Sequence, residues 1–255
     1  MTINDASKPV LTLPPQSLRI EKDTKVKVYG LSLSITVDKR VIWMLNELGI
    51  PYEFVGFDLL KGEHAAKEYQ RLHPSALVPT IQVGDFYMVE SVAILMLLAD
   101  RFPEHRLAPP PDDIERPAYL QWMFYGASTL EGVASRVTLA VPKGLSPDEA
   151  ELKTQLEVFD RYVMILEQVL EERDYLLLSG FSAADMSVAW GLYSANYLGL
   201  LAQYPILKRY YDRLAARPAF QKSFQGDDYY EVAKYAHESG AHAKPADDSG
   251  GAPTL

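Results

Sequence analysis

The segment HPSALVPTIQVGDFYMVESVAI, residues 73–94, decides how the first half of the chain folds. It predicts two short strands joined by a turn at residues 83–85. The apolar run SVAILMLLADRF, residues 91–102, then predicts a helix with Ser91 at its N-cap. A hairpin followed directly by a buried helix indicates the second half of a mixed α/β domain.

The residues before this segment predict a β-α-β unit. KVKVYG, residues 25–30, and YEFVGFDL, residues 52–59, are its two strands. Between them, a helix that stops at Gly49 carries its apolar residues on one face, at Val37, Val41, Met44, Leu45 and Leu48. GEHAAKEYQRL, residues 62–72, adds a short polar helix. The order β-α-β-α-β-β-α is that of a thioredoxin-like domain.

The second half of the chain is helical nearly throughout. Long helices are expected over residues 116–141 and 146–173, and a shorter one over 206–216. Another follows GFSAAD, where Ser182 and Asp185 have the spacing of a capping box.

PEHRLAPPPDD, residues 103–113, separates the two halves, because its four prolines prevent a helix from continuing. We therefore expect an N-terminal extension over residues 1–24, a thioredoxin-like domain over 25–102, a linker over 103–114, an all-helical domain over 115–226 and a polar tail over 227–255.

The composition excludes several classes of function. The 255 residues hold 25 Lys and Arg against 34 Asp and Glu, a net charge of −9, which disfavours nucleic acid as a partner. The chain has no cysteine, so disulfides and cysteine nucleophiles are ruled out. Its five histidines show no metal-binding spacing, and we expect no metal. No stretch is apolar enough for a membrane span, and we expect a cytoplasmic protein.

Two places in the opening segment suit a ligand. Ser91 begins a helix, whose free N–H groups and partial positive charge attract a carboxylate, and Glu90 beside it suits an ammonium group. At Val78-Pro79, a cis proline would expose the Val78 backbone, so that a bound peptide pairs with it as an added strand. Taken alone, the first pair is more often a helix cap, and the second an edge-strand proline.

Together, these motifs resemble the glutathione-binding half of the cytosolic glutathione transferase family, in its bacterial, Ser-type, phi- or theta-like form. The family pattern of an N-P or H-P pair, a V-P pair, a hairpin and an E-S pair stands here as His73-Pro74, Val78-Pro79 and Glu90-Ser91. The resemblance implies that the thioredoxin-like domain binds glutathione as co-substrate. The helical domain would then shape the pocket for a hydrophobic electrophile.

The same resemblance assigns the contacts to glutathione. Val78, next to Leu77, would hold the cysteinyl part through its backbone, and Pro79 would be the cis proline. Glu90 and Ser91 would bind the γ-glutamyl end.

The resemblance also implies a contact to the glycyl end of glutathione. LLKGEHAAKEYQRLHP, residues 59–74, is similar to a segment of phi-like and some bacterial members whose His contacts the glycyl carboxylate. His64 matches that histidine, and its alternative is a solvent-exposed role. Ala65 stands where those members often carry a lysine.

Family members ionise the glutathione thiol with a hydroxyl or thiol that follows the first strand. Lowering a thiol pKa by about two units needs roughly 2.7 kcal/mol, which a hydroxyl donor and a helix dipole together supply. The loop LSLSITV, residues 31–37, favours Ser34 as the donor, then Thr36, then Tyr29 before it. Thr36 has an alternative role as a helix cap, and Tyr29 as a packing residue.

The electrophile pocket is expected between the two domains. Its candidate lining comes from the first long helix, and a cover from the tail: Trp122, Phe124, Tyr125 and Arg136, then Tyr229 and Tyr230. An aromatic stripe at helical spacing is also typical of a core.

The leading function is transfer of glutathione to an alkyl or aryl electrophile, which is a detoxification reaction. The same site also suits ether cleavage, dehalogenation, isomerisation or peroxide reduction. A binding or regulatory protein without turnover is the rival, and Ala65 and the altered loop favour it. The resemblance further implies a homodimer.

Overall fold

The computed structural model describes residues 20–33, 36–59, 61–140 and 150–224. Four strands form one sheet in the order β2-β1-β3-β4: β1 (Val26–Leu31), β2 (Tyr52–Phe57), β3 (Thr80–Val83) and β4 (Phe86–Val89). β1 and β2 are parallel, whereas β3 is antiparallel to both β1 and β4. The thioredoxin-like order predicted from the sequence is confirmed.

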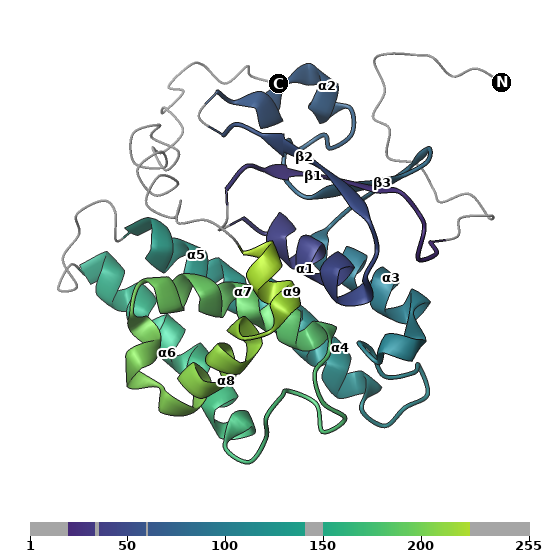
Figure 1. The fold of residues 1–255 in the computed structure, drawn as a ribbon. Coiled ribbons are helices and arrows are strands. Elements are labelled where there is room, and N and C mark those ends of the chain that lie inside the picture. Colours follow the sequence, from purple (N-terminus) through teal and green to yellow (C-terminus); the bar gives the residue numbers. More distant parts are fainter. Residues whose placement is uncertain (1–19, 34–35, 60, 141–149, 225–255) are drawn as a thin grey trace, which may run out of the picture.

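Helices cover both faces of this sheet (Figure 1). α1 (Asp38–Leu48) and α3 (Ser91–Arg101) lie between the sheet and the helical domain, and α2 (Lys67–Gln70) lies on the opposite side. One hydrophobic core runs from the sheet through α1 and α3 into the helical domain. The two halves therefore form one packed unit, with α1 and α3 as its middle layer.

The sequence of α1 explains why it occupies that middle layer. Val41, Met44, Leu45 and Leu48 fall on one face, and none of them is more than 2% exposed. Gly49 ends the helix with φ +69°, a left-handed conformation that favours glycine. The helix therefore stops where the sequence predicts.

Polar contacts fix the segment that connects the thioredoxin-like domain to the helical domain. The 3-10 turn η2 (Pro103–His105) begins the linker, and α4 (Arg116–Phe124) follows it. Arg116 donates to both carboxylate oxygens of Asp100, at 2.7 and 2.9 Å. Glu115 accepts two backbone N–H groups at 2.7 and 3.0 Å, those of Leu178 and Ser179. These contacts tie the start of α4 to α3 and to the loop before α7.

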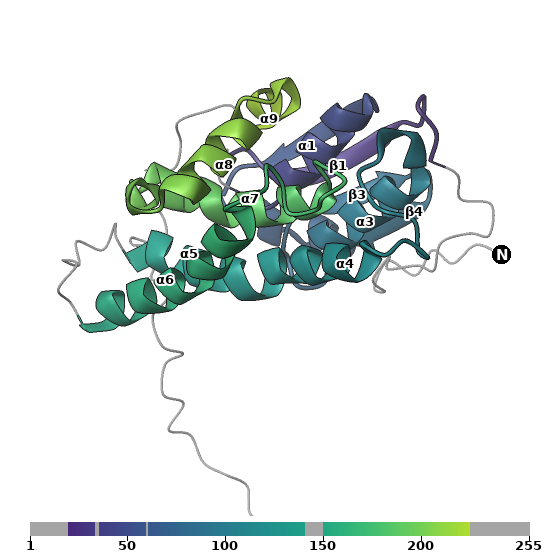
Figure 2. The same ribbon diagram turned by 90° about the horizontal axis from the view of Figure 1, so that it is seen from below.

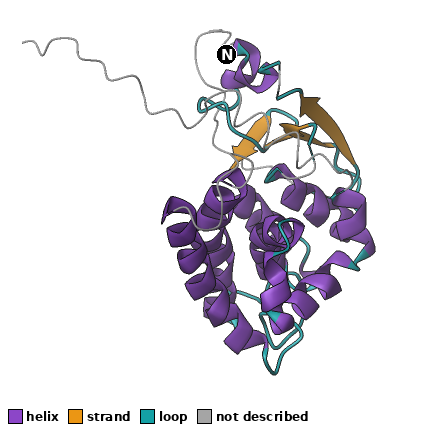
Figure 3. Cartoon of the chain, turned by 90° about the vertical axis from the view of Figure 1, so that its left-hand side faces the viewer, coloured by secondary structure: helices purple, strands orange, loops and turns teal. Residues whose placement is uncertain are grey.

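The helical domain is a bundle on one side of the sheet (Figure 3), and α5 and α6 pack side by side within it (Figure 2). After α4 come a π-helical segment, η3 (Tyr125–Leu130), then α5 (Glu131–Ala140), α6 (Ala150–Leu170), α7 (Ala183–Tyr197), η5 (Leu200–Gln203), α8 (Pro205–Ala215) and α9 (Pro218–Ser223). Helix α9 was not predicted from the sequence, and its Phe220 packs edge-on against Trp43 of α1.

The predicted first long helix is interrupted by η3. Here α7 approaches so closely that a Cβ on Gly126 would lie 2.4 Å from Ser187 Oγ and 2.6 Å from its backbone carbon. The Ser187 hydroxyl donates to the carbonyl of Met123, in the last turn of α4, at 2.7 Å. α7 therefore lies in close contact with this helix at the point where it widens.

The predicted capping box at the start of α7 is confirmed. Ala184 N–H donates to Ser182 Oγ at 3.3 Å, and Ser182 N–H donates to the Asp185 carboxylate at 2.8 Å. Asp185 is fully buried and also accepts from the Tyr210 hydroxyl at 2.8 Å. The box therefore links the start of α7 to α8.

Candidate active site

The register of the sheet brings the candidate segments to one edge. Thr80 pairs with Tyr29 of β1 and with Val89 of β4, so Pro79 and Glu90 lie just beyond the last pairs. β2 runs parallel to β1, and the loops that follow these two strands begin at the same edge. The sheet therefore gathers the predicted thiol loop, the Val78-Pro79 pair and the start of α3 at one place.

The Val78-Pro79 peptide bond is cis, as expected. Tyr69 of α2 holds this segment from both sides, because its hydroxyl donates to the Leu77 carbonyl at 2.6 Å and lies 3.0 Å from Thr80 Oγ1. Within the described part of the chain, the Val78 N–H and C=O make no hydrogen bond. These backbone groups are therefore available to a ligand that pairs as an extra strand.

The start of α3 differs from the prediction in one detail. Ser91 is the first helical residue, and Glu90 occupies the N-cap position with φ +70° and no side-chain cap. A glutamate in this left-handed region is strained, and such strain is found most often at functional sites. The Glu90 carboxylate is exposed and the first N–H groups of α3 are directed at the same edge.

His73 links the His73-Pro74 pair to the start of α3. Its ring lies 6.3 Å from that of Tyr69, and the residue is only 8% exposed. Burial lowers the pKa of His73, and the negative charge of Glu90 partly offsets this effect. Neither the contacts of Tyr69 nor the burial of His73 was predicted from the sequence. The only signal was that Tyr69 is the one aromatic residue in an otherwise polar segment.

His64 lies in the 3-10 turn η1 (Glu63–Ala65), in the loop that follows β2. Its side chain is half-buried, and among the described residues its Nδ1 has no hydrogen-bond partner. The structure therefore leaves this nitrogen unpaired on the loop that begins at the edge described above.

The structure describes two of the three candidate thiol donors, Thr36 and Tyr29. Ser34 lies outside the described residues. The Thr36 hydroxyl donates to the Leu33 carbonyl at 3.1 Å, and it does not cap α1, whose N-cap position is held by Val37. This loop leads directly into the first turn of α1.

Tyr29 lies on the sheet face away from α1, where its ring packs against Phe57 and Tyr69. Its hydroxyl donates to Oε1 of Gln82 at 2.7 Å. Gln82 lies farther than Thr80 from the edge where the loop begins, so this hydroxyl points away from the loop. Burial raises the pKa of Tyr29.

On the helical side, Trp122 and Tyr125 lie together, with ring centroids 5.3 Å apart. Tyr125 donates to the Tyr162 carbonyl at 2.8 Å, and burial raises the pKa of Tyr125 to about 12. Arg136 Nε donates to Gln155 of α6 at 2.8 Å, and Phe124 is 57% exposed. Tyr229 and Tyr230, which are predicted to cover the pocket, lie outside the described residues.

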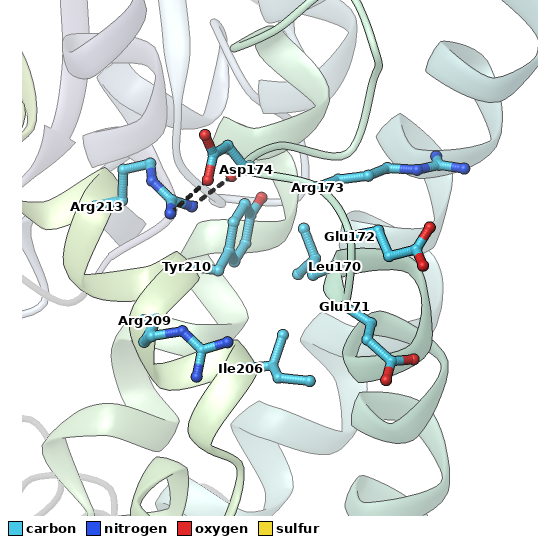
Figure 4. Close-up of a pocket in the computed structure, with 9 residues that line it drawn as sticks. All are labelled: Leu170, Glu171, Glu172, Arg173, Asp174, Ile206, Arg209, Tyr210 and Arg213. Carbon is cyan, nitrogen blue, oxygen red and sulfur yellow. Dashed lines mark hydrogen bonds and ion pairs between the residues drawn. The ribbon is translucent and has the colours of Figure 1, made fainter.

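A cavity of about 370 Å³ lies between the end of α6 and α8 (Figure 4). It is lined mainly by charged side chains, and Arg213 pairs with Asp174 at 2.6 Å within it. Its lining is Leu170, Glu171, Glu172, Arg173, Asp174, Ile206, Arg209, Tyr210 and Arg213. No predicted site residue is among them, so this cavity is distinct from the expected interdomain pocket.

Within the described ranges, no cluster of three or more His, Cys, Asp or Glu side chains is placed to bind a metal ion. No helix in the same ranges has the length and apolar character needed to span a membrane.

The fold and the edge described above define a two-domain protein with a thioredoxin-like, ligand-binding half and an all-helical half. The glutathione S-transferase N-terminal domain matches residues 37–106, and the glutathione S-transferase C-terminal domain matches residues 148–213. This chain belongs to the glutathione S-transferase family.

Several glutathione S-transferases align with this chain over most of their length. Glutathione S-transferase 3 of Zea mays is 30% identical over 206 residues, which are 78% of this chain and 92% of the relative. Glutathione S-transferase hmp2 of Hypomyces subiculosus is 28% identical over 78% of this chain and 97% of the relative. A glutathione transferase of Phanerochaete chrysosporium, crystallised with oxidized glutathione, has the same fold: the TM-score is 0.69 and the identity 24%, over 82% of this chain and 98% of that one.

Proposed function

We propose that this chain is a glutathione transferase that binds glutathione at the sheet edge beside α1 and α3 and directs its thiolate at a hydrophobic electrophile. The observation that carries the proposal is the register of the sheet. It brings the Val78 backbone, the start of α3 and the loop before α1 to one edge in a member of this family. Glutathione is the co-substrate, and no metal takes part.

The tripeptide would lie across that edge as an added strand. Its cysteinyl backbone pairs with the N–H and C=O of Val78, and Leu77 and Pro79 flank this contact. The γ-glutamyl carboxylate lies at the N–H groups and hydroxyl of Ser91, and the ammonium lies at Glu90. His64, in the loop that follows β2, serves the glycyl carboxylate.

The loop before α1 would ionise the thiol. Ser34 is the first candidate donor and Thr36 the second, because the partial positive charge of the α1 N-terminus acts at the same place. Tyr29 ranks third, since its hydroxyl is held by Gln82. The thiol proton leaves to solvent, and the thiolate remains bound.

The thiolate would then attack an electrophilic carbon held between the domains. A carbon–sulfur bond forms, and the leaving group departs with the electron pair of the bond that breaks. Trp122, Tyr125 and Arg136 are proposed for the electrophile side. The same thiolate also suits ether cleavage, dehalogenation, isomerisation or peroxide reduction.

The test is titration of bound glutathione by the ultraviolet absorbance of its thiolate, with S-methylglutathione as the control without an ionisable thiol. We expect calorimetry to detect binding of both compounds and the thiol pKa to fall by about two units on the wild-type protein. Ser34→Ala should abolish the fall, whereas Tyr29→Phe should leave it. Ser91→Ala and Glu90→Gln should weaken binding of both compounds.

If both compounds bind but the thiol titrates as in water, the chain is a binding protein without turnover. If neither binds, the proposed function is wrong. If Thr36→Val abolishes ionisation and Ser34→Ala does not, Thr36 is the donor and the function stands.

A homodimer, a cytoplasmic location and a role in detoxification complete the proposal. Support for the dimer comes from the family and from Phe124, a large apolar side chain that is 57% exposed on α4. Sedimentation at micromolar concentration should give two chains per particle, and Phe124→Glu should weaken the association. A single chain per particle for the wild type would contradict the dimer.

A further inference from the structure

The first turn of α1 buries three charged residues in succession. Asp38, Lys39 and Arg40 are 0%, 6% and 0% exposed. Burying a charge costs free energy unless it is paired, so each of these residues needs a partner. The Lys39 amine donates to the Leu31 carbonyl at 2.9 Å and to Asp38 at 2.7 Å, and it lies 4.5 Å from the ring centre of Phe54. This pair ties α1 to the end of β1.

Arg40 reaches across the domain boundary instead. Its Nη2 donates to the Glu131 carboxylate, and its guanidinium lies 5.5 Å from the ring centre of Trp190 in α7. Among the described residues, the Arg40 Nε and Nη1 have no hydrogen-bond partner. The buried cation is therefore held by one carboxylate, that of the first residue of α5, directly after the π segment.

The other end of α1 carries a comparable ion pair. Glu47 accepts from Arg217, with Oε1–Nε at 2.6 Å and Oε2–Nη2 at 2.9 Å. Trp43 Nε1 also donates to Glu47 at 2.9 Å. α1 is thus fixed to the helical domain at both ends, by Arg40–Glu131 beside the thiol loop and by Glu47–Arg217 far from it.

We infer that Arg40 and Glu131 are positioning residues that set the ionisation of the bound thiol, whereas the Glu47–Arg217 pair serves stability alone. This inference rests on the proposed function. The reason is geometric: the dipole of α1 acts on the thiolate only over the first turn, and hydrogen-bonded donors lose most of their effect when displaced by about 1 Å. The Arg40–Glu131 pair is the contact that fixes this turn relative to the electrophile side.

The direction in which the thiol pKa shifts distinguishes a positioning role of the Arg40–Glu131 pair from a direct effect of its charges on the thiolate. Removing the Glu131 charge with Glu131→Gln leaves Arg40 with an uncompensated positive charge, which by itself stabilises a nearby thiolate and lowers the thiol pKa. If the first turn of α1 is displaced instead, its dipole stabilises the thiolate less, and the thiol pKa rises. Arg40→Lys keeps the charge without the planar guanidinium, so a positioning role predicts a raised pKa there as well.

The experiment compares Glu131→Gln and Arg40→Lys with Glu47→Gln, the matched variant at the other end of the same helix. We expect Glu131→Gln to raise the pKa of bound glutathione by about one unit, which, from a wild-type value about two units below the ordinary thiol value of about 8.5, lowers the thiolate fraction at pH 7 about threefold. kcat should fall accordingly, and KM for glutathione should change less than about twofold, because the tripeptide contacts lie on other elements. Glu47→Gln should lower the urea midpoint of unfolding and leave the thiol pKa unchanged.

The inference is overturned if Glu131→Gln and Glu47→Gln shift the thiol pKa equally, or if Glu131→Gln lowers it. Urea unfolding of every variant shows which of them fold, and Glu131 is exposed enough, at 27%, for its glutamine variant to fold. If wild-type protein itself fails to bind or ionise glutathione, the proposed function fails, and that result is distinct from equal shifts in the two variants.

Discussion

His73 is buried beside Tyr69 and Glu90, and its lowered pKa makes the folded state sensitive to acid. Above about pH 6.5, the ring is neutral in both the folded and the unfolded chain, and its contribution to stability is complete. Below that pH, the unfolded chain takes up a proton that the folded His73 takes up only at lower pH. We therefore expect the free energy of unfolding to fall as the pH falls.

His73→Gln should remove this part of the pH dependence, measured as urea midpoints between about pH 7 and pH 5. His105→Gln, which removes a histidine from the linker, serves as the control for the loss of a histidine. If the urea midpoint of His73→Gln changes with pH as steeply as that of the wild type, His73 is not the source of the pH dependence.

Tyr69 is a positioning residue for the segment around Val78. Tyr69→Phe removes the hydroxyl that bonds the Leu77 carbonyl and Thr80, and we expect it to cost about 1–3 kcal/mol of stability, since the buried Thr80 hydroxyl and the Leu77 carbonyl both lose a partner. Affinity for S-methylglutathione should fall in calorimetry, although Tyr69 is not a proposed ligand contact. Unchanged affinity would show that the segment keeps its shape without this hydroxyl.

The candidate ligand residues could be predicted from the sequence because each belongs to a short local pattern. Glu90 and Ser91 precede an apolar helix, and Val78-Pro79 opens a strand. Tyr69 and His73 could not, because their roles depend on which segments lie beside α2 in three dimensions. The hydrogen bond of the Tyr29 hydroxyl could not be predicted either, since it depends on the β1–β3 register that brings Gln82 within reach.

At the level of elements, the π segment depends on how closely α7 approaches it. Gly126→Ala would place a Cβ against the backbone of Ser187, and we expect a loss of about 1–3 kcal/mol. Gly132→Ala is the matched control in α5, where the nearest atom is the mobile end of Arg136 at 3.7 Å. That change should stabilise by about 0.5–1 kcal/mol, as alanine does in a helix. Urea unfolding measures both, and equal effects would contradict the close approach.

Helix α1, the hairpin and the capping box of α7 follow from spacing and end signals in the sequence. The π segment does not, because Ser187 lies more than fifty residues beyond it in the chain. α9 could not be predicted for a similar reason. It is only six residues long, and its Phe220 is buried by Trp43, which lies far away in the sequence.

For the whole molecule, α1 and α3 form a layer shared by the two halves. Trp43 is fully buried and packs against Phe181, Phe220 and Phe224 of the helical domain. Trp43→Ala should cost about 3–5 kcal/mol and shift the unfolding of both halves together. Far-ultraviolet circular dichroism and the fluorescence of Trp122 and Trp190 should give coincident urea transitions. Two separate transitions would show that the halves unfold independently.

The π segment has a consequence for how this molecule can change over evolutionary time. A π turn holds one residue more than the same turn of α-helix, and each residue of an α-helix advances the side chains by about 100°. Deletion of a single codon within residues 125–130 would therefore turn the π segment into an ordinary α-helical turn and leave the side chains of α5 close to their present phase, with Glu131 still facing Arg40. The same deletion within the regular turns of α4 would instead rotate every side chain of α5 by about 100° and turn Glu131 away from Arg40.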